Sequence, residues 1–316
     1  MIKSSIKKIL RATDSIVQKN TGQHRVDSPG LLILTFHGTF ERSQDAYCGD
    51  VDPQQAITIA HLREAIESML EAGYSFVGTD SVRYLEPSRH WTMLTFDDGL
   101  ATNQLVLPLL EEFQIPGVFF VCTGHVEHQK AFWWDVVYRN RKRQGVSDSA
   151  IAEEVKELKL LRMNEIEQRL RDDFGPRAMR VLGDLDRAMT VTELKKFASS
   201  PWVRIGNHTR DHAILTVLSP GEIEEQVVSA QDSLEAWIGL RPTTIAYPNG
   251  NSSPEIRSQM RSLGLLQGQT VRALKSSLPI HDLYALPRVT LWGQRSIQDQ
   301  LQEARCGVSL IETLRR

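Results

Sequence analysis

Residues 94–99 of this 316-residue chain, Leu94-Thr95-Phe96-Asp97-Asp98-Gly99, join a short apolar run to two adjacent carboxylates and a glycine. The apolar run predicts a buried β-strand, and the glycine allows the backbone to turn directly after the carboxylates. Enzymes built on α/β barrels hold their functional side chains at such strand ends. We therefore expect Asp97 and Asp98 to line a functional site in an α/β fold.

Short β-rich runs alternate with helical patterns along most of the chain. The predicted strands cover 31–36, 92–96, 117–122, 203–206, 244–247 and 286–291, and the predicted helices cover 57–70, 103–113, 222–238, 254–263 and 297–304. This rhythm indicates a parallel sheet with crossover helices. The runs at 31–34 and 118–121 are apolar throughout, as in strands that are covered on both faces. The sequence therefore predicts a (β/α) barrel rather than an exposed antiparallel sheet.

Two parts of the chain depart from this alternation. Charged residues crowd the segment from about 133 to 196, while Ile151, Leu158 and Ile166 keep a near-helical period, which predicts a helical insertion. The insertion either covers the site as a lid or is an elaboration with no part in catalysis. We expect residues 1–30 to form an N-terminal helical extension and residues 31–316 to form one catalytic domain that carries the insertion.

Composition and charge exclude several classes of protein. With 41% hydrophobic residues and a formal net charge of -2, the chain is globular and has no overall field that would attract nucleic acid. Its three cysteines lack the short spacing of a zinc knuckle and favour a reducing compartment. The sequence has neither an apolar export-signal core nor a membrane span, so we expect a cytoplasmic protein. The N-terminal helix, basic and amphipathic, leaves peripheral membrane contact open.

Two histidines four residues apart follow another predicted strand, in the stretch Gly206-Asn207-His208-Thr209-Arg210-Asp211-His212. Two imidazoles and one carboxylate hold a divalent metal and leave positions open for water and a substrate oxygen. His208, His212 and one of the two aspartates supply this set, and the other aspartate remains available as a base. An iron oxygenase would use the same ligands but would leave the second aspartate without a role. A hydrolytic metal site is therefore predicted.

Polar residues also follow the remaining predicted strands. They are His37, His125, Asn249 and Arg288. Because all strand ends of a closed parallel barrel point to one face, we expect these side chains to contribute to the same pocket.

The motifs resemble those of the polysaccharide deacetylases with the NodB-homology domain, the carbohydrate esterase family 4 type. Residues 95–99 resemble the first motif of that family, residues 208–212 the second, and Ala246-Tyr247-Pro248-Asn249-Gly250 a variant of the third. The resemblance runs from about Leu31 to Leu291. It implies a distorted (β/α) barrel and the hydrolysis of an N-acetyl group, sometimes an O-acetyl group, on a sugar.

The resemblance also implies roles for individual residues. Asp98, His208 and His212 would bind the metal, usually zinc, and Asp97 would be the base that activates water. A backbone N–H near Asn249 would hold the oxyanion, and such donors commonly contribute a large part of catalysis. The expected partner is a carbohydrate substrate.

The chain departs from the family pattern at two places. Many members carry an arginine shortly before the third-motif proline that orients the catalytic aspartate, and here Arg288 is the predicted replacement from another strand. The late Leu-x-His motif, whose histidine protonates the leaving amine, reads Leu286-Pro287-Arg288. The two candidates for this proton donor are therefore His281 and His37.

These observations predict a metal-dependent hydrolase that removes an N-acetyl group from a polysaccharide or from a nucleotide-linked or lipid-linked sugar. A deformylase or another amidase would use the same site. A sugar-binding module that has lost catalysis is the alternative from another class, motivated by the two departures. Retention of both Asp97 and Asp98 argues against it, because a binding module needs no base.

Overall fold

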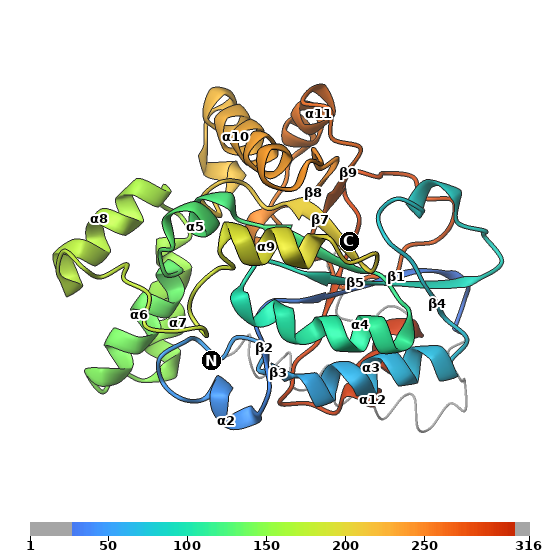
Figure 1. Cartoon of the computed structure of the whole chain (residues 1–316), viewed down its shortest axis with the longest axis horizontal. Helices are drawn as coiled ribbons and strands as arrows, with labels where there is room; N and C mark the ends of the chain where they lie inside the picture. Colours follow the sequence, from blue (N-terminus) through green and yellow to red (C-terminus); the bar gives the residue numbers. More distant parts are fainter. Residues whose placement is uncertain (1–26, 307–316) are drawn as a thin grey trace, which may run out of the picture.

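A parallel β-sheet forms the centre of the molecule in the computed structural model, which describes residues 27–306 (Figure 1). The strand order is β10-β1-β5-β6-β7-β8-β9, and β4 also pairs with β5. The strands are β1 (Gly30–Phe36), β4 (Ser75–Phe76), β5 (His90–Phe96), β6 (Gly117–Val121), β7 (Val203–Asn207), β8 (Thr244–Ala246), β9 (Gln267–Gln269) and β10 (Val289–Thr290). A separate parallel pair consists of β2 (Thr39–Phe40) and β3 (Ile57–Thr58).

The sheet curls until its two edge strands meet at a seam. At one edge β10 pairs with β1. The residues just before β10 run beside the other edge strand, because the Leu286 N–H donates to the Gly268 carbonyl at 2.9 Å and the Thr270 N–H donates to the Leu286 carbonyl at 2.8 Å. One short segment, 286–290, therefore joins both edges and closes the distorted (β/α) barrel that the sequence predicts.

The uninterrupted apolar strands form the core. Every residue of β1 and of β6 is buried, in agreement with their continuous hydrophobic sequences. Phe96 stacks between Phe36 and Phe119 of the neighbouring strands, at ring-centroid distances of 5.3 and 4.7 Å. Because Phe96 directly precedes Asp97, this packing fixes the point at which the carboxylates emerge from the sheet.

Helices cover the outer faces of the sheet (Figure 1). They are α3 (Ile59–Glu71), α4 (Leu107–Phe113), α9 (Val191–Ala198), α10 (Pro220–Ile238), α11 (Pro254–Ser262) and α12 (Ile297–Arg305). The shorter α2 (Ser43–Ala46) lies beside the β2–β3 pair, and α5 (Thr123–His128) contacts α10. The ends of α10 follow local sequence signals, since Ser219 and Glu222 form a capping box and Gly239 ends the helix at a φ of 72°. Between residues 27 and 306, no helix has both the length and the apolar character to cross a bilayer.

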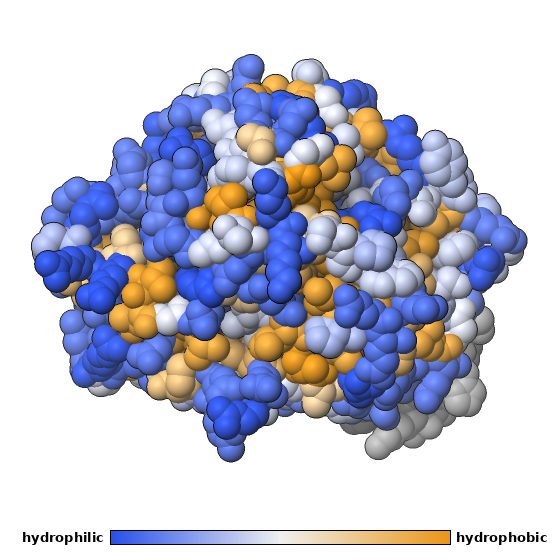
Figure 2. Space-filling model, viewed as in Figure 1, coloured by the Kyte–Doolittle hydropathy of each residue, from blue (hydrophilic) through white to orange (hydrophobic). Residues whose placement is uncertain are grey.

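The insertion consists of three helices beside the barrel, at the left of Figure 1: α6 (Trp133–Arg143), α7 (Asp148–Leu158) and α8 (Met163–Phe174). Ile151, Leu158 and Ile166 lie in a small core that is separate from the main barrel core, while hydrophilic residues cover most of the outer surface of this part (Figure 2). The predicted end at 196 falls inside α9. That helix belongs to the barrel, because its Phe197 packs edge-on against Phe119.

The predicted N-terminal extension, and the membrane contact predicted for its helix, lie in residues 1–30, of which only 27–30 are described.

Candidate active site

The strand ends bring the first two motifs into contact. Asp98 follows β5, and His208 and His212 follow β7. Oδ1 of Asp98 lies 3.5 Å from Nε2 of His208 and 3.5 Å from Nε2 of His212. Burial opposes ionisation of the Asp98 carboxyl, but the two facing imidazoles outweigh it and lower the pKa of Asp98. A charged carboxylate and two imidazole nitrogens therefore converge on one point.

The ligand atoms of Asp98 and His208 have no hydrogen-bond partner among residues 27–306. Both Asp98 oxygens and Nε2 of His208 are buried without one, which is unfavourable unless another group satisfies them. Nδ1 of His208 is 2.8 Å from the Ala246 carbonyl. That contact places the ring proton on Nδ1 and directs the lone pair of Nε2 toward Asp98. The donor set fits a divalent cation.

Two side chains compete for the position of third metal ligand. Sγ of Cys122 and one ligand atom each of Asp98 and His208 lie within 4.8 Å of one another. Burial, however, raises the pKa of the Cys122 thiol well above its usual value, and Sγ donates to the His208 carbonyl at 3.4 Å. Burial lowers the pKa of His212 to about 3 and leaves the neutral imidazole, which is the form that binds metal. Chemically, His212 is the better third ligand.

Asp97 is held by Arg288, which is completely buried. Nη1 and Nη2 of Arg288 each donate to one oxygen of Asp97 at 2.7 Å, and Nε donates to the Thr270 carbonyl at 3.0 Å. Burial raises the pKa of Asp97, but Arg288 and then His208 outweigh this effect, and the net pKa is lowered. Arg288, which directly precedes β10, thus contacts Asp97 from another part of the sheet.

His37 is the candidate proton donor that the structure brings to the site. It follows β1, and its Nε2 lies 4.0 Å from Oδ2 of Asp97. Its side chain is 24% exposed, so the imidazole lies between the buried carboxylate and solvent.

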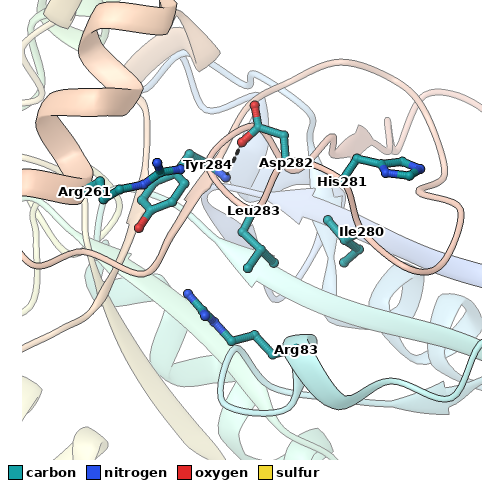
Figure 3. Close-up of a pocket in the computed structure, with 7 residues that line it drawn as sticks. All are labelled: Arg83, Arg261, Ile280, His281, Asp282, Leu283 and Tyr284. Carbon is teal, nitrogen blue, oxygen red and sulfur yellow. Dashed lines mark hydrogen bonds between the residues drawn. The ribbon is translucent and has the colours of Figure 1, made fainter.

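His281 lies at the opposite end of the barrel. Its segment runs parallel to β9, and the Gly268 N–H donates to the Leu283 carbonyl at 2.9 Å, so His281 is level with the amino end of that strand. It lines a separate cavity of about 400 Å³ with Arg83 and Arg261 (Figure 3). The structure does not bring His281 to Asp97, and its position does not support the prediction that it donates a proton there.

Asn249 lies in the turn after β8, where its side chain meets the insertion. Nζ of Lys159, the residue directly after α7, donates to Oδ1 of Asn249 at 2.9 Å. Burial lowers the pKa of Lys159, although Asp52 and Asp98 oppose this effect. Lys159 has no signature in the sequence, because nothing in a charged helical segment indicates which lysine faces the barrel.

An aromatic layer supports the histidines from behind. His125 stacks on Phe132 at a centroid distance of 3.9 Å, Phe132 stacks on Trp134 at 4.8 Å, and Trp134 meets the His212 ring edge-on at 4.7 Å. Burial lowers the pKa of His125 to about 4. These aromatic side chains are buried, so they pack against the motif that carries His208 and His212.

Backbone strain is concentrated at the same strand ends. The φ angle is 76° at Asp98, 63° at Thr209, 56° at His212 and 57° at Asn249. Residues with a side chain seldom adopt this left-handed conformation, and it recurs at functional sites where the surrounding structure enforces it. All three motifs carry such strain.

A parallel barrel with functional side chains gathered at its strand ends is an arrangement common to many enzymes. The sequence model described as "Polysaccharide deacetylase" matches residues 85–268, more than half of the chain. The chain belongs to the polysaccharide deacetylase family.

The relatives in this family are distant or matched over a short part. The peptidoglycan-N-acetylmuramic acid deacetylase PdaC of Bacillus subtilis is 42% identical over 57 residues, which are 18% of this chain and 12% of PdaC. The fold is similar to the solved structure of the Streptococcus pyogenes deacetylase PplD in complex with acetate, with a TM-score of 0.59 and 17% sequence identity. The match includes 87% of this chain and 98% of the PplD chain. The match to the structure of IcaB from Ammonifex degensii includes 89% of this chain and 98% of the IcaB chain, with a TM-score of 0.59 and 18% sequence identity. Both structures are similar to this chain in fold.

Proposed function

We propose that this protein is a metal-dependent deacetylase that hydrolyses an N-acetyl group on a carbohydrate. The observation that carries this proposal is the pairing of two adjacent carboxylates with different surroundings. Asp97 is held by Arg288, whereas the oxygens of Asp98 face two imidazoles and lack hydrogen-bond partners within the described part of the chain. One carboxylate is thus suited to be a base and the other to be a metal ligand.

In this proposal Asp98, His208 and His212 hold a divalent metal, and family resemblance favours zinc. The chemistry that a bound divalent metal supplies is polarisation of the acyl carbonyl and of a water molecule. Asp97 accepts the proton of that water, and Arg288 keeps both of its oxygens aligned for this step. The lowered pKa of Asp97 keeps it ionised and able to accept the proton.

The remaining roles fall to the turn after β8 and to His37. The backbone N–H near Asn249 donates to the oxygen that becomes negative during hydrolysis. His37 faces Asp97 at 4.0 Å, and we assign its Nε2 to a hydrogen bond with the reacting amide group of the substrate.

The first experiment measures acetate release by protein that has been stripped with a chelator and then reloaded with zinc. The panel contains N-acetylated polysaccharide, peptidoglycan fragments, and nucleotide-linked and lipid-linked N-acetyl sugars, with formyl analogues beside them. Zinc-dependent acetate release that is lost in Asp97→Asn supports the proposal. Formate release without acetate release would identify a deformylase instead. Tight zinc binding without any release would favour a sugar-binding role. The cytoplasmic location stays a prediction, and cell fractionation tests it.

A further inference from the structure

Gln55 holds His37 by both ends of its side-chain amide. The backbone N–H of His37 donates to Oε1 of Gln55 at 3.0 Å, and Nε2 of Gln55 lies 2.8 Å from Nδ1 of the His37 ring. Gln55 is only 4% exposed. The neighbouring residue Asn103 donates from Nδ2 to the His37 carbonyl at 2.8 Å, so the backbone and the ring of His37 are both fixed.

These contacts determine the protonation of the ring. A backbone N–H can only donate, so the amide atom that faces it must be the carbonyl oxygen of Gln55. The other amide atom is therefore the NH₂ group, which also only donates. Nδ1 of His37 must accept that hydrogen bond, and a neutral imidazole with an accepting Nδ1 carries its proton on Nε2. Nε2 is the atom that faces Asp97.

We propose that Gln55 is a positioning residue that fixes the tautomer of the His37 ring, with the proton on Nε2, so that His37 donates a hydrogen bond in the site without releasing its proton. An imidazolium ring would direct an N–H from Nδ1 at the NH₂ group of Gln55, where no acceptor exists. This inference rests on the proposed function and assigns the final proton transfer within it.

The proton balance then involves one carboxylate. Asp97 takes a proton from water as the new carbon–oxygen bond forms. Asp97 returns that proton to the nitrogen as the carbon–nitrogen bond breaks, which releases acetate and the amine. Throughout, the Nε2–H of His37 stays in place as a hydrogen-bond donor.

The loop around Gln55 is built to hold this side chain. The φ angles of the residues on either side, Gln54 and Ala56, are 44° and 49°. The Gln54 N–H donates to Oδ1 of Asp52 at 2.9 Å, and the Gly293 N–H donates to the Gln55 carbonyl at 2.7 Å. Left-handed backbone on both sides of one buried polar residue is expected where the surrounding structure enforces a functional position.

The test is ¹⁵N NMR of the histidine rings in the full-length, zinc-loaded protein, with the His37 signals assigned by their loss in His37→Asn. We expect the Nδ1 signal of an unprotonated nitrogen and the Nε2 signal of a protonated one. In Gln55→Glu, whose carboxylate accepts from both His37 groups, the proton should move to Nδ1. Gln54→Glu is the matched control, since it makes the same charge change one residue away, and its His37 signals should stay as in the wild type.

The second readout is acetate release from N-acetylglucosamine oligomers. Moving the proton to Nδ1 removes the Nε2–H donor from the site, and loss of one such donor typically lowers kcat by about 10²-fold to 10³-fold, so we expect kcat of Gln55→Glu to fall by about this factor while KM changes less than about threefold. A protonated Nδ1 in the wild type would overturn the proposal, and so would full activity of Gln55→Glu after the proton has moved. Absence of activity in the wild type would overturn the proposed function, while the NMR result would still decide the state of His37.

Discussion

Two buried arginine–aspartate pairs, one in the barrel and one in the insertion, look alike but have different surroundings. Arg288 and Asp97 form the pair in the barrel, and Arg139 and Asp186 form the pair in the insertion. Asp186 also accepts hydrogen bonds from the N–H groups of Leu182 and Gly183, at 2.9–3.0 Å. Arg139 donates further to two backbone carbonyls. The hydrogen-bonding groups of the insertion pair are therefore satisfied by each other and by nearby backbone groups.

The barrel pair is not saturated in this way. Among the described residues, the Asp97 carboxylate accepts hydrogen bonds from Arg288 alone, while Nε2 of His37 and Nε2 of His208 lie 4.0 and 3.9 Å away. The next residue, Asp98, has two oxygens without partners in the same part of the chain. An ion pair by itself thus says little about function. The polar atoms beside Asp97 that lack hydrogen-bond partners in this part of the chain distinguish the candidate active site from the Arg139–Asp186 pair, whose role is structural.

The largest effect is expected from Asp97→Asn. Loss of the base should reduce acetate release by about 10²-fold to 10⁴-fold, with zinc content and circular dichroism unchanged. The matched variant Asp186→Asn should retain the wild-type kcat in its folded fraction. Equal loss of kcat in both variants would remove the distinction between the two pairs.

The second-largest effect is expected in the insertion pair, where a substitution should lower stability rather than activity. Arg139→Met leaves Asp186 as an uncompensated buried charge, which should lower the free energy of unfolding by about 3–5 kcal/mol. Urea unfolding measures this change. The double variant Arg139→Met/Asp186→Leu should recover most of the loss, because it removes both charges. If Arg139→Met were as stable as the wild type, the Arg139–Asp186 pair would not have the structural role described above.

Metal binding gives a third test, since the barrel pair lies beside the proposed metal site. Binding to the folded state alone should stabilise the protein by about 2.7 kcal/mol at a free zinc concentration 100 times Kd. Asp98→Asn should abolish this zinc-dependent rise in Tm, and Asp186→Asn should retain it. A zinc-dependent rise that persists in Asp98→Asn would place the metal elsewhere.

The smallest effect is expected from a third and more exposed pair, Arg187 and Glu193. Hydrogen bonds from Arg187, opposed by partial burial, lower the pKa of Glu193 to about 2 from a usual 4.5. Because the folded state lowers this pKa, the stabilisation is present above pH 4.5 and is lost as the pH falls toward 2. Solvent screening reduces it to about 1 kcal/mol. Glu193→Gln should be less stable than the wild type by that amount at pH 6 and by much less at pH 3 in urea titrations.

The sequence predicts the barrel well where strands are long and apolar. The strands at β1, β5, β6 and β7 were expected within two residues of their observed ends, because their hydrophobic runs have no other stable placement than a covered sheet. β4 (Ser75–Phe76) and β9 (Gln267–Gln269) were missed. Both are very short, and β9 contains two glutamines and a glycine, so neither gives a hydrophobic signal.

The part of the candidate site that lies at the strand ends could be predicted from the sequence. Asp98, His208 and His212 meet because their strands end at one face. The placement of His281 depends on the path of a long loop along β9, and the contact of Lys159 depends on the orientation of the insertion. Such long-range geometry is not encoded in local spacing. For the same reason, nothing in the sequence indicates that the side chain of Gln55 forms hydrogen bonds with His37.

The seam of the barrel has a consequence for how the protein is made. Arg288 lies in the short segment that joins the two edge strands, almost 200 residues after Asp97 in the chain. A ribosome therefore completes both carboxylates and both histidines of the proposed site long before it synthesises the guanidinium that aligns the proposed base. Until that segment docks, the Asp97 carboxylate lacks the Arg288 hydrogen bonds that hold it in the folded protein. Barrel closure and completion of the Arg288–Asp97 pair are thus one event, and a translation product that ends before residue 288 lacks the arginine that aligns the proposed base.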